Sequence, residues 1–274
     1  MEQAIVAVPC GIHDLASGRW ITQVRLRQLV GHDEKFIAEL SDMPLHLRIL
    51  AFLKRVASFE EGETATLLRK LSIGDRVALM LHVRRLELGD NLDCTISCTK
   101  CGKGMSVMLS AAKLLGTRNP ERSPTYNVEA SGFNLRIKLL TALDQDMLLN
   151  AKEGEDLIQT LARSCIAVSD QPLPEKLPDE VIRAIGSKLE QIDPLSDILL
   201  ALSCPECGHK FSASFNVEDF VLRELGIGQG DMDSEVHWLA LHYHWSENEI
   251  LSLPLRRRRK YISLINSALS GGSA

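Results

Sequence analysis

Two copies of the pattern Cys-x-x-Cys-Gly constrain this chain more than any other feature of its sequence. In each copy the two-residue gap lets both sulfur atoms face one ion, and the following glycine permits the left-handed turn that starts a return strand. Two such knuckles supply the four thiolates of a tetrahedral site, which leaves no position open for water or substrate. We therefore expect one structural Zn²⁺ to be held by Cys98, Cys101, Cys204 and Cys207.

The sequence around the two motifs repeats when it is shifted by 106 positions. Apolar residues alternate with polar ones before and after each knuckle, which predicts a β-hairpin in both copies. A helix cap closes each copy, Ser110 in the first and Asn216 in the second. The duplication gives each knuckle the same support and favours one shared ion. The matching apolar positions are Leu92, Cys94, Ile96, Met105, Val107 and Leu109 in one copy and Ile198, Leu200, Leu202, Phe211, Ala213 and Phe215 in the other.

The remaining cysteines have no ligand spacing. Cys94 corresponds to Leu200 in the repeat, and Cys10 and Cys165 lack a neighbouring ligand, so we interpret all three as small buried residues. A redox-active pair is the alternative for the two motifs, but such pairs sit at the start of a helix, where the thiol pKa falls, and not between two strands. An odd total of 7 cysteines without a signal peptide argues against a disulfide framework and predicts a cytoplasmic protein.

Composition excludes several classes of protein. A chain of 274 residues exceeds one small module, and 45% hydrophobic residues suffice for a packed core. No apolar run approaches the roughly 18 residues that a membrane-spanning helix needs, so we expect no membrane partner. The net charge of -5 and the aromatic content of 5% disfavour a whole-protein nucleic-acid binder, although a local basic patch could act alone.

Hydrophobic periodicity predicts further elements before the first motif. Asp33 is expected to cap a short helix, and Ser72 with Asp75 forms an approximate capping box for a longer helix that Gly89 ends. The expected elements are a strand over 20–26 and helices over 33–40, from about 44 to 56, up to 71, and over 72–88.

Between the two motifs we expect a second hairpin at 126–138, followed by helices that begin at Thr141 and run past Cys165. Three prolines in residues 171–178 exclude regular structure, and we take this segment as the best internal boundary before a helix over 179–191. The sequence thus predicts an α+β fold, predominantly helical, with two β-hairpin zinc knuckles joined in a zinc-ribbon-like four-cysteine site. We divide it into an N-terminal strand and helices (1–60), a duplicated helix and zinc-knuckle core (61–230) and a C-terminal helical pair with a basic run (231–274).

The C-terminal segment carries this basic run on a predicted helix. Ser246 and Glu249 form a capping box, and Pro254 begins a following helix. On that helix the inward face is expected to consist of Tyr261, Ile262, Leu264 and Ile265. The basic side chains then provide a solvated or partner-facing surface, made of Arg256, Arg257, Arg258, Arg259 and Lys260.

Two further groups resemble functional motifs only superficially. Gaps of five and two fit no ligand spacing, so we expect packing or surface roles for His237, His242 and His244. A phosphate loop would follow a strand and precede a Lys-Ser/Thr pair, so we interpret as a hinge the glycines Gly226, Gly228 and Gly230. No motif of a nucleophilic hydrolase, zinc protease or Walker ATPase is present, and we expect no enzymatic activity.

Several segments together resemble a known family. They are ITQVRLRQLVGHDEKFIAEL after Trp20, LSIGDRVALMLHVRRLELGDNLDCTISCTKC over 71–101, CPECG over 204–208, and HWLALHYHWSENEILSLPLRRRRKYISLI over 237–265. The family is the baseplate hub-assembly family of contractile-tailed phages and related contractile injection systems. The resemblance implies a non-enzymatic hub component or a chaperone for hub and spike assembly, with the four cysteines as the family's knuckles. Residues 138–141 depart from the Arg-Leu-Pro-Thr that the family more typically carries.

The leading hypothesis is therefore a structural or assembly protein that binds baseplate hub or spike proteins and has no small-molecule substrate. Its basic C-terminal surface would face an acidic partner. A zinc-ribbon regulator that contacts nucleic acid through residues 256–260 is the alternative. A redox-sensing chaperone, which would lose zinc when its thiols oxidise, is a third.

Overall fold

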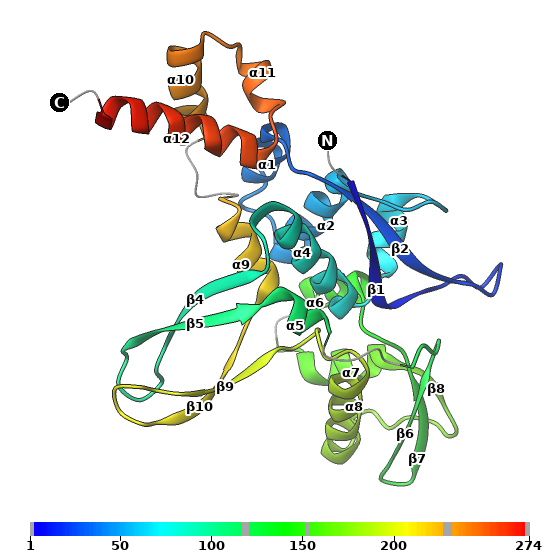
Figure 1. Cartoon of the computed structure of the whole chain (residues 1–274). Coiled ribbons are helices and arrows are strands. Elements are labelled where there is room, and N and C mark those ends of the chain that lie inside the picture. Colours follow the sequence, from blue (N-terminus) through cyan, green and yellow to red (C-terminus); the bar gives the residue numbers. More distant parts are fainter. Residues whose placement is uncertain (1–2, 117–120, 152–153, 227–231, 272–274) are drawn as a thin grey trace.

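The computed structural model describes residues 3–116, 121–151, 154–226 and 232–271 of this mixed α and β protein (Figure 1). The strands are β1 (Gln3–His13), β2 (Trp20–Arg27), β3 (Ala57–Ser58), β4 (Asn91–Ser97), β5 (Gly104–Ser110), β6 (Tyr126–Ala130), β7 (Phe133–Ile137), β8 (Ile166–Ser169), β9 (Leu199–Ser203) and β10 (Lys210–Ser214). The helices are α1 (Gly31–Ala38), α2 (Leu45–Val56), α3 (Thr64–Lys70), α4 (Ile73–Leu88), α5 (Ala111–Leu115), α6 (Ala142–Leu149), α7 (Leu157–Cys165), α8 (Asp179–Ile192), α9 (Val217–Glu224), α10 (Met232–Tyr243), α11 (Glu247–Leu251) and α12 (Leu255–Gly271).

The first hydrophobic cluster surrounds an N-terminal sheet of strand order β1-β2-β3. β2 confirms the strand predicted over 20–26. β1, which the sequence analysis did not predict, pairs antiparallel with β2 and bulges between Ala7 and Ile12. Pro9 and Gly11 lie in this bulge, where Pro9 has no N–H to donate and Gly11 adopts a φ of 74°. They interrupt the alternation by which a strand is recognised in a sequence.

Helix α4 crosses the centre of the first cluster and has the predicted cap at each end. Ser72 Oγ accepts a hydrogen bond from the backbone N–H of Asp75 (3.0 Å), and Gly89 ends the helix with a φ of 89°. The Asp75 carboxylate, however, does not return to Ser72 as a capping box requires. It accepts the backbone N–H groups of Cys10 (2.7 Å) and Gly11 (2.6 Å), which lie in the bulge of β1. The carboxylate therefore fastens β1 to α4.

A second hydrophobic cluster lies between the sheet β6-β7-β8 and helices α7 and α8. β6 and β7 confirm the hairpin predicted at 126–138. The helix predicted to run past Cys165 ends there instead, because residues 166–169 form β8 and pair with β7. The boundary predicted at 171–178 is also wrong. Cys165 before it and Val181 after it pack in the same cluster, so this segment is a loop within one packed unit.

The two cysteine motifs lie at the ends of two hairpins, β4–β5 and β9–β10, which extend side by side away from the helices (Figure 1). Strand register confirms the repeat: Cys94 lies opposite Val107 in one hairpin, and Leu200 lies opposite Ala213 in the other. Each hairpin is followed by a capped helix, α5 after the first and α9 after the second. The paired hairpins, residues 91–110 and 199–214, are named the cysteine arm below.

Helices α10, α11 and α12 form a third, small cluster around Leu239, Ile250 and Ile265. The predicted capping box of Ser246 and Glu249 is present at the start of α11, and α12 begins directly after Pro254. Among the described residues, no helix combines the length and the apolar character that crossing a membrane requires.

Candidate metal centre and the C-terminal junction

The two hairpins present their cysteines with the same local geometry. In each knuckle the backbone N–H of the first cysteine donates to the carbonyl oxygen of the residue after the glycine, Cys98 to Lys103 and Cys204 to His209, both at 2.9 Å. The two motif glycines have φ values of 71° and 68°, the left-handed conformation that their position predicts. The repeat in the sequence is therefore a repeat in the structure.

The four thiols converge at the tip of the cysteine arm. Sγ of Cys98 lies 3.8 Å from Sγ of Cys207, and Sγ of Cys101 lies 3.7 Å from Sγ of Cys204. All four sulfur atoms lie within 4.8 Å of one another. Sulfur ligands placed about 2.3 Å from a tetrahedral zinc are about 3.8 Å apart. The structure thus brings together the four predicted ligands at separations that fit one metal ion.

Burial divides the four cysteines into two kinds. Cys98 and Cys204, the first cysteine of each motif, are 3% and 2% exposed. Cys101 and Cys207, the second of each, are exposed. An ion held by all four would therefore be covered on one side by the hairpins and would lie near solvent on the other.

The pKa values of two neighbouring thiols diverge within the cluster. The backbone N–H of Cys101 lowers the pKa of Cys98 to about 6, and the N–H of Lys100 acts in the same direction. A hydrogen bond from the N–H of Lys103 also lowers the pKa of Cys101, but desolvation and the other sulfur atoms together outweigh it and raise that pKa to about 12. One thiolate therefore forms readily here, whereas four thiolates need a cation to neutralise them.

The other three cysteines are buried, as their lack of ligand spacing predicts. Burial raises the pKa of Cys165 to about 11 and also raises the pKa of Cys10. Cys94 packs in the first hydrophobic cluster, and its thiol donates to the carbonyl oxygen of Val107 (3.2 Å). These thiols are small, protonated packing residues.

The four-cysteine cluster is the only group of candidate metal ligands within the ranges that the structure describes. Exposed side chains belong to the three histidines considered above, His237, His242 and His244. The predicted glycine hinge falls mostly outside the described residues, namely at Gly228 and Gly230. Gly226 is described and has a φ of 79°.

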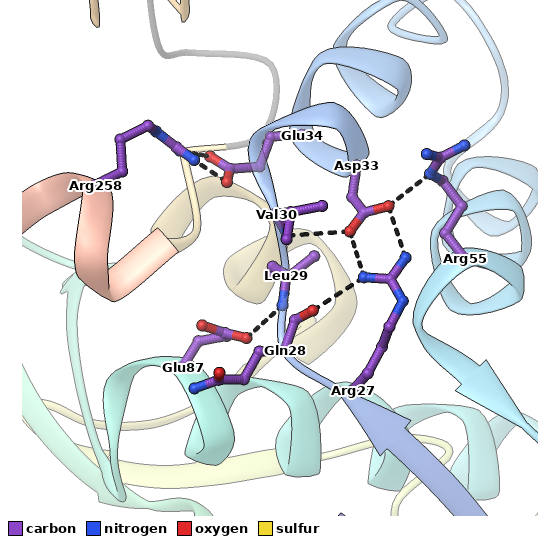
Figure 2. Close-up of polar contacts among 9 residues, drawn as sticks. All are labelled: Arg27, Gln28, Leu29, Val30, Asp33, Glu34, Arg55, Glu87 and Arg258. Atoms are coloured by element: carbon purple, nitrogen blue, oxygen red, sulfur yellow. Dashed lines mark hydrogen bonds and ion pairs between the residues drawn. The ribbon is translucent and has the colours of Figure 1, made fainter. Parts of the chain in front are cut away.

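A second polar site, which the sequence analysis did not foresee, joins the turn between β2 and α1 to α12 (Figure 2). Arg258 donates from Nη2 to both carboxylate oxygens of Glu34 (2.8 and 2.7 Å) and from Nε to Glu235 (2.6 Å). Its side chain is 0% exposed. The prediction that Arg258 faces solvent or a partner is therefore wrong, because two carboxylates hold its guanidinium inside the protein. Glu34, Glu235 and Arg258 are named the C-terminal junction below.

Asp33, next to the junction, holds the same turn in place (Figure 2). Its carboxylate accepts hydrogen bonds from Arg27 (2.7 and 2.9 Å), Arg55 (2.7 Å) and the backbone N–H of Val30 (3.1 Å). Burial alone would raise the pKa of Asp33, but these hydrogen bonds outweigh it and hold the pKa below its usual value. Asp33 is not the predicted helix cap, because α1 begins at Gly31 and Val30 occupies the cap position.

The other residues of the basic run differ in their contacts. Arg256 donates from Nε to a backbone carbonyl oxygen of α4 (2.6 Å), and Arg259 donates from Nη2 to the carbonyl oxygen that follows α9 (3.2 Å). Arg257 and Lys260 are exposed. Leu264, predicted on the inward face of the helix, is 50% exposed instead, because it lies on the side of α12 that faces away from the third cluster.

A family model described as T4 bacteriophage base plate protein matches residues 19–222. The chain belongs to this family. Membership supports a structural or assembly role in a phage baseplate and contact with other baseplate proteins. A search of curated proteins and a search of solved structures return no match to the chain.

The matched region of this baseplate-family protein runs from the start of β2 into α9 and includes both halves of the cysteine arm. Helices α10, α11 and α12 lie outside it. The C-terminal junction connects the two parts, since Glu34 belongs to the matched region and Glu235 and Arg258 do not.

Proposed function

We propose that this chain is a non-enzymatic structural or assembly factor of a phage baseplate, either a hub component or a chaperone for hub and spike assembly. The observation that carries the proposal is the convergence of four thiols from two hairpins, since a closed four-sulfur site supports a scaffold and offers no substrate position. Family membership supplies the setting. The protein acts in the cytoplasm of the producing cell by binding hub or spike proteins, and it can remain in the finished particle.

Zn²⁺ is the ion we propose for Cys98, Cys101, Cys204 and Cys207. Four thiolates in tetrahedral array favour zinc over harder cations such as magnesium or calcium. A two-stranded hairpin is marginally stable by itself in water. Zinc binding can contribute on the order of 10 kcal/mol, which is enough to hold two such hairpins together as one rigid arm.

Metal analysis tests the zinc part of the proposal. We expect one zinc ion per purified chain by inductively coupled plasma mass spectrometry and none in the Cys204→Ser variant. The matched control is Cys94→Ser, which alters a cysteine of the same arm outside the cluster and should keep the ion. A metal-free wild-type chain, or zinc retained by Cys204→Ser, would contradict the proposal. Zinc loss on mild oxidation with a gain of holdase activity would favour the redox-sensing chaperone instead.

Co-expression with the hub and spike proteins of the same phage tests the assembly part. We expect the chain to co-purify with at least one of them. Detection of the chain in mature particles would identify a hub component, and detection only in assembly intermediates would identify a chaperone. The absence of any association with either protein would overturn the proposed function.

A further inference from the structure

Helix α12 has a cationic surface that the rest of the molecule leaves partly unused. Its sequence contains five basic residues and no acidic residue. The C-terminal junction binds Arg258, and backbone carbonyl oxygens bind Arg256 and Arg259. Within the described ranges, no carboxylate forms an ion pair with Arg257 or Lys260, and Arg257 donates only to the hydroxyl of its neighbour Tyr261 (3.4 Å).

The two free cations share one side of α12 with an exposed leucine. Arg257, Lys260 and Leu264 stand at positions i, i+3 and i+7, which lie along one face of an α-helix. Leu264 is 50% exposed. Seven residues of helix span about 10 Å, so the leucine lies roughly two turns beyond Arg257. A solvated face would not require a large apolar side chain in this row.

The C-terminal end of α12 also extends past the helices that support it. Ile265 is 5% exposed and packs in the third hydrophobic cluster, whereas Leu269, one turn further along the same side, is 54% exposed. Figure 1 shows this end of α12 projecting away from α11 and from the rest of the chain. The apolar side of the helix thus continues after its partners within the chain have ended.

These features favour a protein partner over a nucleic acid. Each phosphate contact uses one cation, and two free cations on α12 are few for a nucleic-acid footprint. Leucine side chains on the same helix add nothing to phosphate binding, but they are typical anchors of an amphipathic helix that lies in an apolar groove. The net charge of -5 opposes long-range attraction of a polyanion.

We propose that the exposed side of α12 docks into an apolar groove bordered by carboxylates on the hub or spike protein, with Leu264 and Leu269 as apolar anchors and Arg257 and Lys260 as charged flanks. This inference rests on the proposed function and names the surface through which it operates. The charged flanks accelerate association and make it sensitive to salt, whereas the leucines slow dissociation.

Binding of purified hub and spike proteins to the full chain, measured by biolayer interferometry at low and high salt, tests the inference. We expect the double variant Arg257→Glu/Lys260→Glu to bind about 10- to 100-fold more weakly at low salt, with a smaller difference at high salt. Leu264→Ala should weaken binding about tenfold at both salt concentrations. Matched controls of the same charge and size change, at exposed sites elsewhere, are Lys176→Glu/Arg183→Glu and Leu15→Ala.

The outcomes separate this inference from the proposed function. Wild-type binding that the α12 variants leave unchanged would overturn the inference and preserve the proposed function. No binding of either protein to the wild-type chain would overturn both. A photoreactive phenylalanine analogue at position 264 should crosslink to an apolar partner segment that contains Asp or Glu, and a crosslink to a basic segment would count against the groove. Tight binding of duplex DNA that Arg257→Glu/Lys260→Glu abolishes, with hub and spike binding intact, would assign this surface to nucleic acid instead.

Discussion

The cysteine arm and the C-terminal junction both join segments that lie far apart in the chain, but they do so by different chemistry. The arm joins Cys98 to Cys207 and Cys101 to Cys204 through sulfur atoms near solvent. The junction joins Glu34 to Arg258 through charges that are 6% and 0% exposed. The arm therefore depends on an ion that the chain must acquire, whereas the junction depends on two charges that must remain paired because neither is solvated.

Breaking the arm should produce the largest effect. We expect Cys204→Ser to lower the free energy of unfolding by about 5 kcal/mol or more, because it removes the ligand set that binds the metal. Urea denaturation followed by circular dichroism, with metal content measured on the same samples, checks this expectation. Excess chelator should reproduce the loss in the wild-type chain and leave Cys204→Ser unchanged. Equal stability of the two chains in the presence of zinc would show that the arm does not depend on the ion.

Breaking the junction should cost somewhat less and should act on different segments. Replacing one member of a buried ion pair leaves the other charge unpaired, so we expect Arg258→Met to destabilise the protein by about 3–5 kcal/mol. Hydrogen exchange should then show faster opening of α1 and of α10 to α12, with the cysteine arm unaffected. The neighbouring Arg257→Met is the matched control, and because Arg257 is exposed it should change stability by less than about 0.5 kcal/mol.

A second substitution separates lost packing from unpaired charge. If the unpaired carboxylate causes the instability, Arg258→Met combined with Glu34→Leu should recover much of the loss. Part of the loss should remain, since Glu235 also contacts Arg258 and its side chain is 33% exposed. A double variant no more stable than Arg258→Met would assign the effect to packing of the arginine stem.

The contrast between the two sites also explains what the sequence could reveal. The arm is built from local motifs, so spacing alone predicted both hairpins, their caps Ser110 and Asn216, and the four ligands. The junction is built from single residues on three elements, and no local pattern connects Glu34 with Arg258. One signal was present: Arg258 shares a helical row with Leu255 and Ile265, and a cation in an apolar row requires a buried carboxylate.

The same distinction accounts for the missed strand β1. Its bulge is stabilised by the Asp75 carboxylate, which accepts the N–H groups of Cys10 and Gly11. Such an irregular strand is specified by its tertiary partner and not by its own alternation of side chains. The wrong boundary at 171–178 has a similar cause, since proline content indicates a loop but does not show which clusters the loop connects.

Buried carboxylates should make the body of the protein sensitive to pH. Desolvation raises the pKa of Asp75 to about 7, and nearby Asp193 acts in the same direction. The folded state therefore binds more protons than the unfolded state between about pH 4 and pH 7, so this group's contribution to stability falls as pH rises through that range and is constant above it. The loss amounts to at most about 4 kcal/mol.

The difference in unfolding free energy between the wild type and Asp75→Asn isolates this contribution from the other titrating groups. We expect that difference to fall between pH 4 and pH 7, measured by denaturation in urea at each pH, and to level off above it. A difference that stays constant across the range would show that Asp75 titrates near its ordinary pKa and that its two N–H donors outweigh desolvation. The cysteine arm should show no matching trend, since Asp75 contacts β1 and not the hairpins.

The smallest effect concerns the two halves of the arm itself. Ser110 and Asn216 occupy equivalent cap positions, and each accepts a backbone N–H three residues further on, at 3.1 Å and 3.0 Å. We expect Ser110→Ala and Asn216→Ala each to cost about 1 kcal/mol in urea denaturation, with Ser106→Ala on the exposed side of β5 as a neutral control. Ser110 should be the more costly of the two, because its hydroxyl also donates to Asp90 (2.5 Å). Equal costs would mean that the caps alone govern the helices, whereas a larger cost for Asn216→Ala would show that the second half of the repeat is the less stable one and depends more on the metal.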